Sequence, residues 1–89
     1  MSEQYVLYQY DSCPFCYRVK AFLAQAGIEI PMKDTMFDRD AYVELFRGGG
    51  SGQVPCLRIE REGEAVEWLY ESGDIIEYLA GRAGSSTAS

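Results

Sequence analysis

The chain has 89 residues, 47% of them hydrophobic, which is enough for one domain with a small core. Its formal net charge of −6 argues against a nucleic-acid partner, because such partners require a basic surface. The absence of histidine excludes Cys–His catalysis and mixed Cys/His zinc sites, and no apolar run approaches the roughly 18 residues of a membrane-spanning helix.

The first predicted strand, 5–10, is almost continuously apolar, as expected for a strand that is covered on both faces. Asp11 and Ser12 end it, and either residue would suit the N-cap of the helix that follows. That helix runs to Gln25, and hydrophobic residues recur along it at the spacing of one buried face. They are Phe15, Val19, Phe22, Leu23 and Ala26.

Three strands and two helices are predicted for the rest of the chain. They are a strand over 28–33, a helix over 40–46, strands over 54–59 and 65–70, and a helix over 72–79. Pro31 favours an edge position for the second strand, and Ser72 suits the N-cap of the last helix. The glycine-rich segment 48–52 ends the second helix, and we expect it to be flexible.

This order of elements predicts an α/β fold in which a four-stranded mixed sheet is flanked by three helices. The first βαβ unit should be parallel and right-handed, and the last two strands should form an antiparallel hairpin. We expect the first and third helices on one face of the sheet and the second helix on the other. Residues 1–83 form the predicted domain, and the small, polar residues 84–89 are predicted to be a disordered tail.

The motif Cys13-Pro14-Phe15-Cys16 lies where the first strand gives way to the first helix. There the unpaired N–H groups and the positive end of the helix dipole stabilise a thiolate at Cys13. Cys16 is almost one turn deeper, within reach of a mixed disulfide on Cys13. Pro14 lacks an N–H group, which costs nothing in the first turn of a helix. The motif therefore predicts a thiol–disulfide site.

Two structural thiols, or part of an all-cysteine zinc site, are the alternatives for this motif. Zinc would need two more thiolates and only Cys56 remains, so we expect no metal. Strand alternation should turn Cys56 to the face opposite that of Pro55, so we expect Cys56 to be a buried, inert thiol. An odd number of cysteines argues against a secreted disulfide framework, and the N-terminus lacks a basic, apolar signal sequence. We therefore expect a cytoplasmic protein that does not associate with membranes.

From Tyr5 to Leu79 the sequence resembles the glutaredoxins and the N-terminal thioredoxin-fold domain of the glutathione transferases. The order of elements is one basis of this resemblance, and three motifs are the others. These are Cys13-Pro14-Phe15-Cys16 followed by Tyr17-Arg18-Val19-Lys20, then Gly52-Gln53-Val54-Pro55, and Glu71-Ser72 before Ile75-Ile76-Glu77-Tyr78-Leu79. The resemblance implies a thioredoxin-like fold.

The resemblance also implies roles for residues outside the cysteine pair. Pro55 would be cis and would face Cys13, leaving the Val54 backbone free to pair with a peptide-like ligand; the alternative is that Pro55 only starts a strand. Glu71 and Ser72 would bind the γ-glutamyl end of glutathione, besides capping the last helix. Arg18 and Lys20 would help to hold a thiolate or the glycyl carboxylate, or else are solvated surface residues.

Two features depart from this resemblance. Tyr10 stands where many glutaredoxins have a lysine for the glycyl carboxylate, and we expect Tyr10 to point away from the site. Arg47 joins Arg18 and Lys20 as a candidate for that role. The helical second domain of the transferases is not part of this sequence, which favours reduction over conjugation.

The resemblance thus implies a glutathione-dependent thiol–disulfide oxidoreductase. Cys13, Cys16 and Pro55 would be its catalytic residues, and glutathione its reductant. We expect a monomer whose partners are glutathione and glutathionylated or disulfide-containing proteins. The alternatives are a glutathione-binding iron–sulfur or assembly module, in which two chains share a cluster, and a conjugating domain of the transferase kind.

Overall fold

The computed structural model describes the backbone of residues 3–88 and the side chains of residues 3–81. The elements in this part of the chain follow the predicted order. They are Glu3–Gln9 (β1), Pro14–Ala26 (α1), Met32–Asp34 (β2), Arg39–Gly49 (α2), Cys56–Arg61 (β3), Glu67–Leu69 (β4) and Ser72–Ala88 (α3). No helix within residues 3–88 is both long enough and apolar enough to cross a membrane.

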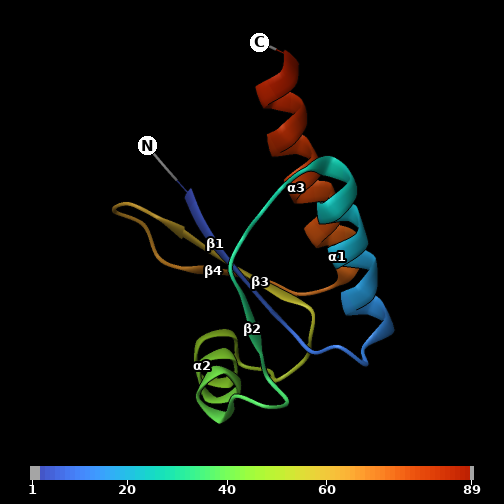
Figure 1. Ribbon diagram of the computed structural model, residues 1–89. Coiled ribbons are helices and arrows are strands. Elements are labelled where there is room, and N and C mark those ends of the chain that lie inside the picture. The colour runs from blue at the N-terminus through green and yellow to red at the C-terminus, as the bar shows by residue number, and fades with distance from the viewer. Residues whose placement is uncertain (1–2, 89) are drawn as a thin grey trace.

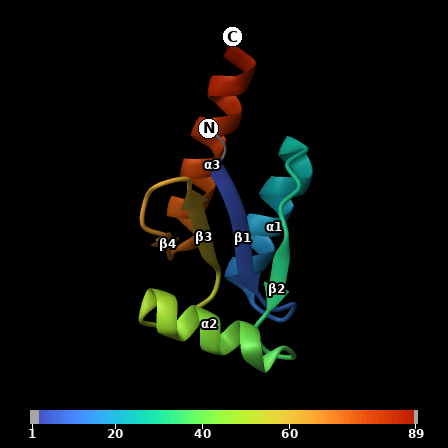
Figure 2. The ribbon, with the colours of Figure 1, turned by 90° about the vertical axis from the view of Figure 1, so that its left-hand side faces the viewer.

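The four strands form one mixed sheet in the order β2-β1-β3-β4. β1 lies inside the sheet, parallel to β2 with Leu7 opposite Met32, and antiparallel to β3 with Leu7 opposite Leu57. β3 and β4 are also antiparallel. Because β1 and β2 are parallel, both end at the edge of the sheet where β3 begins, so the connecting segments gather there (Figure 2).

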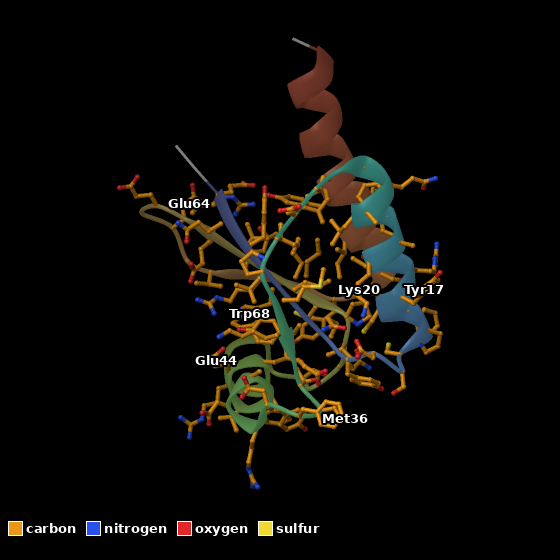
Figure 3. All side chains as sticks on the ribbon, viewed as in Figure 1. Tyr17, Lys20, Met36, Glu44, Glu64 and Trp68 are labelled. Carbon is orange, nitrogen blue, oxygen red and sulfur yellow. The ribbon has the colours of Figure 1, made fainter. Side chains whose placement is uncertain are left out.

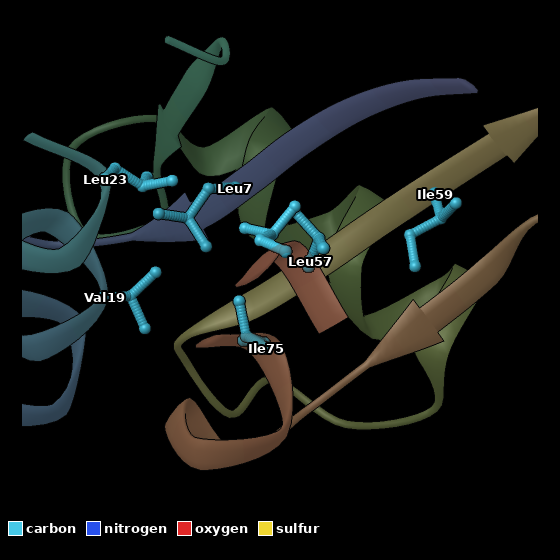
Figure 4. Packing of buried hydrophobic residues seen from close by; sticks show 7 residues of the cluster. Leu7, Val19, Leu23, Leu57, Ile59 and Ile75 are labelled. Atoms are coloured by element: carbon cyan, nitrogen blue, oxygen red, sulfur yellow. The ribbon is translucent and has the colours of Figure 1, made fainter. Parts of the chain in front are cut away.

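The two faces of the sheet have different cores. Neighbouring side chains of a strand point to opposite faces, so Leu7 and Tyr8, both fully buried, belong to different clusters. Leu7 joins an aliphatic cluster formed by the sheet, α1 and α3 (Figure 4). Tyr8 packs with Ala41, Leu45 and Cys56 beneath α2. Figure 1 shows α2 on the opposite side of the sheet from α1 and α3, which confirms the predicted layering.

The second strand is shorter than predicted. It begins at Met32 and not at residue 28, because Pro31 has no N–H group to donate to the sheet. The Pro31 carbonyl instead accepts a hydrogen bond from the Leu7 N–H at 2.9 Å, just before the strand starts. Ile28 and Ile30 pack against the aliphatic cluster from the connection, so their hydrophobicity serves the core without a strand.

The glycine-rich segment is packed, where the sequence predicted flexibility. α2 continues through Gly48 and Gly49 and ends at Gly50, whose φ of 85° suits a glycine cap. A Cβ atom at Gly48 would lie 2.0 Å from the Trp68 ring, and one at Gly49 would lie 1.9 Å from the Tyr70 hydroxyl oxygen. The glycines therefore allow two aromatic side chains of the hairpin to lie directly against the helix backbone.

The last helix is longer than predicted. Its backbone is helical as far as Ala88, whereas residues 84–89 were predicted to be a disordered tail; Ser89 lies outside the described residues. The segment contains no proline, and adding a residue to an existing helix costs far less than starting a new one. The expected boundary at residue 83 therefore does not appear in the secondary structure.

Candidate active site

Cys13 is the N-cap residue of α1. Its backbone is extended, with φ −88° and ψ 117°, and its Sγ accepts a hydrogen bond from the Cys16 N–H at 3.3 Å. The sequence predicted Asp11 or Ser12 for this role, and that prediction is wrong. A thiol at the N-cap reaches the N–H three residues on, as a serine hydroxyl would, and Pro14 begins the helix proper. The sulfur thus lies at the positive end of the helix dipole.

The loop before β3 brings a second backbone group to this sulfur. The Val54–Pro55 peptide bond is cis, as the resemblance implied, and Pro55 is buried. The Cys13 Sγ lies 3.9 Å from the Val54 carbonyl oxygen, although the two residues are 41 positions apart. The fold therefore places Cys13 against the Val54 backbone, and only 5% of the Cys13 surface is exposed.

Cys16 is fully buried behind Cys13. Burial, and then the hydrogen bond with Cys13, raise the pKa of the Cys16 thiol to about 12, while a backbone hydrogen bond from Tyr10 and the charge of Lys20 act in the opposite direction. The pair is consequently asymmetric: one sulfur borders solvent at a helix N-terminus, and the other remains a protonated thiol at neutral pH.

An open pocket of about 470 Å³ adjoins Cys13, within the size range of small-molecule sites. Its lining comes from the segments that gather at this edge of the sheet. The lining residues are Tyr10, Phe15, Gly52, Gln53, Val54, Pro55, Glu71 and Ser72. The structure thus brings together five of the residues implied by the resemblance. Val54, Pro55, Glu71 and Ser72 line the pocket, and the Cys13 sulfur lies 3.9 Å from the Val54 carbonyl oxygen.

Glu71 and Ser72 are arranged differently from the simple cap predicted. The Glu71 carbonyl accepts the first hydrogen bond of α3, from the Ile75 N–H at 3.1 Å, so Glu71 holds the cap position and Ser72 begins the helix. Glu71 has a φ of 66°, which is uncommon for a residue other than glycine and costs about 1–3 kcal/mol. The helix start and the Glu71 side chain both belong to the pocket wall.

Tyr10 and Phe15 are pocket residues that sequence reasoning missed. Phe15 was assigned to the buried face of α1 but is 57% exposed, because the first turn of the helix extends past the end of the sheet. Tyr10 was expected to point away from the site and instead lines it. The tyrosine follows the last residue of β1, so the strand alternation on which that expectation rested no longer applies.

The basic residues expected near glutathione are not part of the pocket lining. Lys20 instead donates hydrogen bonds to the Gln9 Oε1 at 3.0 Å and the Asp11 Oδ1 at 3.1 Å. Arg18 is exposed on α1, and neither it nor Arg47 lines the pocket. Lys20 and Arg18 are therefore not among the lining residues, and their part in binding glutathione stays a prediction. Lys20 lies one turn after Cys16 on α1, and its ammonium is bound by Gln9 and Asp11 and does not enter the pocket lining.

Cys56 does not join the other two cysteines. It lies on the face beneath α2, fully buried as predicted, and burial raises the pKa of its thiol to about 12, partly offset by a hydrogen bond with Tyr70. Within the described residues, no group of three or more Cys, Asp or Glu side chains is suited to hold a metal ion.

Comparisons with known proteins place this chain in a family. The family described as "Glutathione S-transferase, N-terminal domain" matches residues 12–82. Prostaglandin E synthase 2 of the mouse, Mus musculus, is 32% identical over 78 residues, which are 88% of this chain and 19% of that protein. The chain thus spans about a fifth of the length of this curated relative.

Solved structures agree with the family match. Maleylacetoacetate isomerase from Anaeromyxobacter dehalogenans, with glutathione bound in its active site, is 28% identical with a TM-score of 0.68, over 93% of this chain and 39% of that chain. Glutathione transferase Omega 2S from Trametes versicolor is 24% identical with a TM-score of 0.75, over 96% of this chain and 40% of that chain. The chain spans about two fifths of each. It belongs to the N-terminal domain family of the glutathione S-transferases.

Proposed function

We propose that the protein is a glutathione-dependent thiol–disulfide oxidoreductase. The observation that carries this proposal is the position of the Cys13 sulfur, 3.3 Å from the Cys16 N–H and 3.9 Å from the Val54 carbonyl, at the border of a pocket that ends in a helix N-terminus. Disulfide exchange begins with attack by a sulfur nucleophile, and Cys13 is the cysteine that the fold places against the Val54 backbone at this pocket.

The pocket suits the parts of a γ-glutamyl tripeptide. The N–H groups at the start of α3 would bind the α-carboxylate of the γ-glutamyl residue, and the Glu71 carboxylate would take the neighbouring ammonium. The Val54 backbone would pair with the cysteinyl residue as an added strand does. This arrangement would direct the sulfur of glutathione towards Cys13.

The proposed reaction consists of two exchanges. The Cys13 thiolate attacks a glutathionylated protein at the sulfur of glutathione, which forms a Cys13–glutathione disulfide and releases the protein thiolate. A second glutathione thiolate then attacks the sulfur of bound glutathione, giving glutathione disulfide and restoring the Cys13 thiolate. With a dithiol substrate, Cys16 would attack Cys13 instead.

Turnover of a glutathione mixed disulfide, coupled to glutathione reductase, tests this proposal. We expect wild type and Cys16→Ser to be active and Cys13→Ser to be inactive, because only Cys13 borders the pocket. Ser72→Ala should raise the KM for glutathione and leave the alkylation rate of Cys13 unchanged. If wild type shows no turnover but binds glutathione, the protein is a binding or assembly module.

The glycyl carboxylate of glutathione offers a second measurement, which tests whether the pocket recognises this charge. Among the described residues, the pocket lining contains no lysine or arginine, and Glu71 is its only charged side chain. An exposed ion pair contributes only about 0–1 kcal/mol, so neutralising the glycyl carboxylate should change kcat/KM less than tenfold. We expect the glycyl ethyl ester of glutathione to be used nearly as well as glutathione. A larger loss would mean that a basic side chain reaches the bound ligand.

Conjugation is the second candidate, because the chain belongs to a transferase family. Attack of glutathione on a chlorinated aromatic compound, followed by absorbance, measures it. A Cys13→Ser variant that conjugates as fast as wild type while lacking disulfide turnover would favour this candidate.

A further inference from the structure

Lys20 on α1 binds Gln9, the last residue of β1, and Asp11 in the turn that follows. Its ammonium donates to the amide oxygen of Gln9 at 3.0 Å and forms an ion pair with Asp11 at 3.1 Å. The Lys20 side chain is 27% exposed, and Gln9 is a buried polar residue. Figure 3 labels Lys20 beside α1. A lysine with these partners gives up much of its rotamer freedom, which on a helix surface it would otherwise keep.

The position of this ammonium matters for Cys16. Lys20 follows Cys16 by four residues, so the two lie one above the other on the same side of the helix. Gln9 adjoins Tyr10, whose backbone hydrogen-bonds the Cys16 thiol. The three groups that act on this thiol are thus Cys13, the Tyr10 backbone and Lys20, and Lys20 is the only cation among them.

The need for such a cation appears once Cys13 has reacted. To close a disulfide, Cys16 must lose its proton while it is buried, and burial is the largest cause that raises its pKa. The two contributions of Cys13 that also raise the Cys16 pKa require a Cys13 thiol or thiolate and disappear when Cys13 forms a mixed disulfide. Burial then remains, opposed by the Tyr10 backbone and by Lys20.

We infer that Lys20 is a positioning residue for the second cysteine: anchored by Gln9 and Asp11, its ammonium stabilises the Cys16 thiolate that closes the Cys13–Cys16 disulfide. This inference rests on the proposed function and assigns a specific step of it to a residue outside the pocket. Lys20 would speed the release of substrate thiols that Cys16 displaces from Cys13. It would not affect the release of thiols by a second glutathione.

The step balances without an added oxidant. Cys16 loses its proton to solvent, and its thiolate attacks the Cys13 sulfur of a Cys13–S–S–R disulfide. The Cys13–Cys16 bond forms as the S–R bond breaks, and R leaves as a thiolate that takes up a proton from water. The disulfide is transferred to the protein, and the substrate is reduced.

Reaction with 5,5′-dithiobis(2-nitrobenzoate) separates the relevant steps. Attack by Cys13 releases a first coloured thionitrobenzoate and leaves a second on Cys13, and closure by Cys16 releases that second one. The first phase reports the reactivity of Cys13 and the second phase reports closure. Cys16→Ser should keep the first phase and lose the second, which assigns the two phases.

We expect Lys20→Met to slow the second phase about twofold to fourfold between pH 7 and 9, with little change in the first. The expected effect is modest, because the charge of Lys20 is the smallest of the causes that act on the Cys16 pKa and because the nucleophilicity of the thiolate rises partly in compensation. Lys20→Arg should restore most of the rate, because it keeps the charge. Lys33→Met is the matched control: that lysine also forms an ion pair, with Glu44 at 2.8 Å, but on β2.

Three results would overturn the inference. Lys20→Met could slow both phases equally, which would mean a general loss of site structure. Lys20→Arg could be as slow as Lys20→Met, or Lys33→Met could have the same effect. These results are distinct from a failure of the proposed function. That failure would be an absence of turnover with glutathione, and the reaction with 5,5′-dithiobis(2-nitrobenzoate) contains no glutathione.

Discussion

Cys16 and Cys56 are both fully buried, and burial raises the pKa of each thiol to about 12, yet the two cysteines lie in different surroundings. The Cys16 N–H donates to the Cys13 sulfur at the start of α1, whereas Cys56 packs with Leu45 beneath α2. Burial alone therefore does not distinguish Cys16, the resolving cysteine of the proposed reaction, from Cys56. The neighbouring sulfur does, because disulfide exchange needs a partner within bonding reach.

The largest expected effect comes from replacing one cysteine on each side of this comparison. Cys13→Ser should lower reductase-coupled turnover by at least about 100-fold, because it removes the nucleophile. Cys56→Ala should leave kcat/KM within about twofold of wild type, since the thiol does not line the pocket. Turnover normalised to folded protein checks both. A large loss in Cys56→Ala with normal stability would give that cysteine a part in the reaction.

The next largest effect is expected from a change of packing on the face of the sheet beneath α2, where Cys56 lies. Gly48→Ala should destabilise the protein by about 1–3 kcal/mol, because its Cβ atom would overlap the Trp68 ring. Urea denaturation measures this, and the turnover of the folded fraction should not change. Gly81→Ala is the matched control, because a Cβ atom at Gly81 meets no atom within 4 Å. Equal changes in the unfolding free energy of Gly48→Ala and Gly81→Ala would mean that the Trp68 ring moves aside without cost.

The pH dependence of stability gives the smallest effect. The Cys56 thiol has a folded-state pKa of about 12, above the unfolded value of about 8.5, so the folded state binds the proton more tightly. This contribution is complete below about pH 8.5 and is lost as pH rises towards 12, at up to about 1.4 kcal/mol per pH unit. The unfolding free energy of Cys56→Ala should therefore fall less steeply than that of wild type between pH 9 and 10.

Equal slopes for Cys56→Ala and wild type would show that the Cys56 thiolate is tolerated in the folded state. In that case the two buried cysteines would differ in their solvation as well as in their neighbours. Cys16→Ala, measured in the same way, completes the comparison, because burial is the largest cause of the raised pKa in both thiols.

Local sequence patterns were enough to predict the order of elements, the mixed sheet and the layering of the helices. The apolar run of β1, the helical spacing of Val19 and Leu23, and Pro31 are short-range signals that depend on neighbouring residues alone. The place of the cysteine pair at the start of α1 was predictable for the same reason, because its spacing and the helix that follows it are local features.

The composition of the pocket was decided by tertiary structure. Cys13 and the Val54 carbonyl are 41 residues apart, and only the antiparallel pairing of β1 with β3 brings them within 3.9 Å. The outward position of Phe15 and the anchoring of Lys20 by Gln9 depend on where the sheet ends beneath α1. Helical spacing identifies the face of a residue, but the partner of a long, flexible side chain depends on groups that only the folded chain brings near.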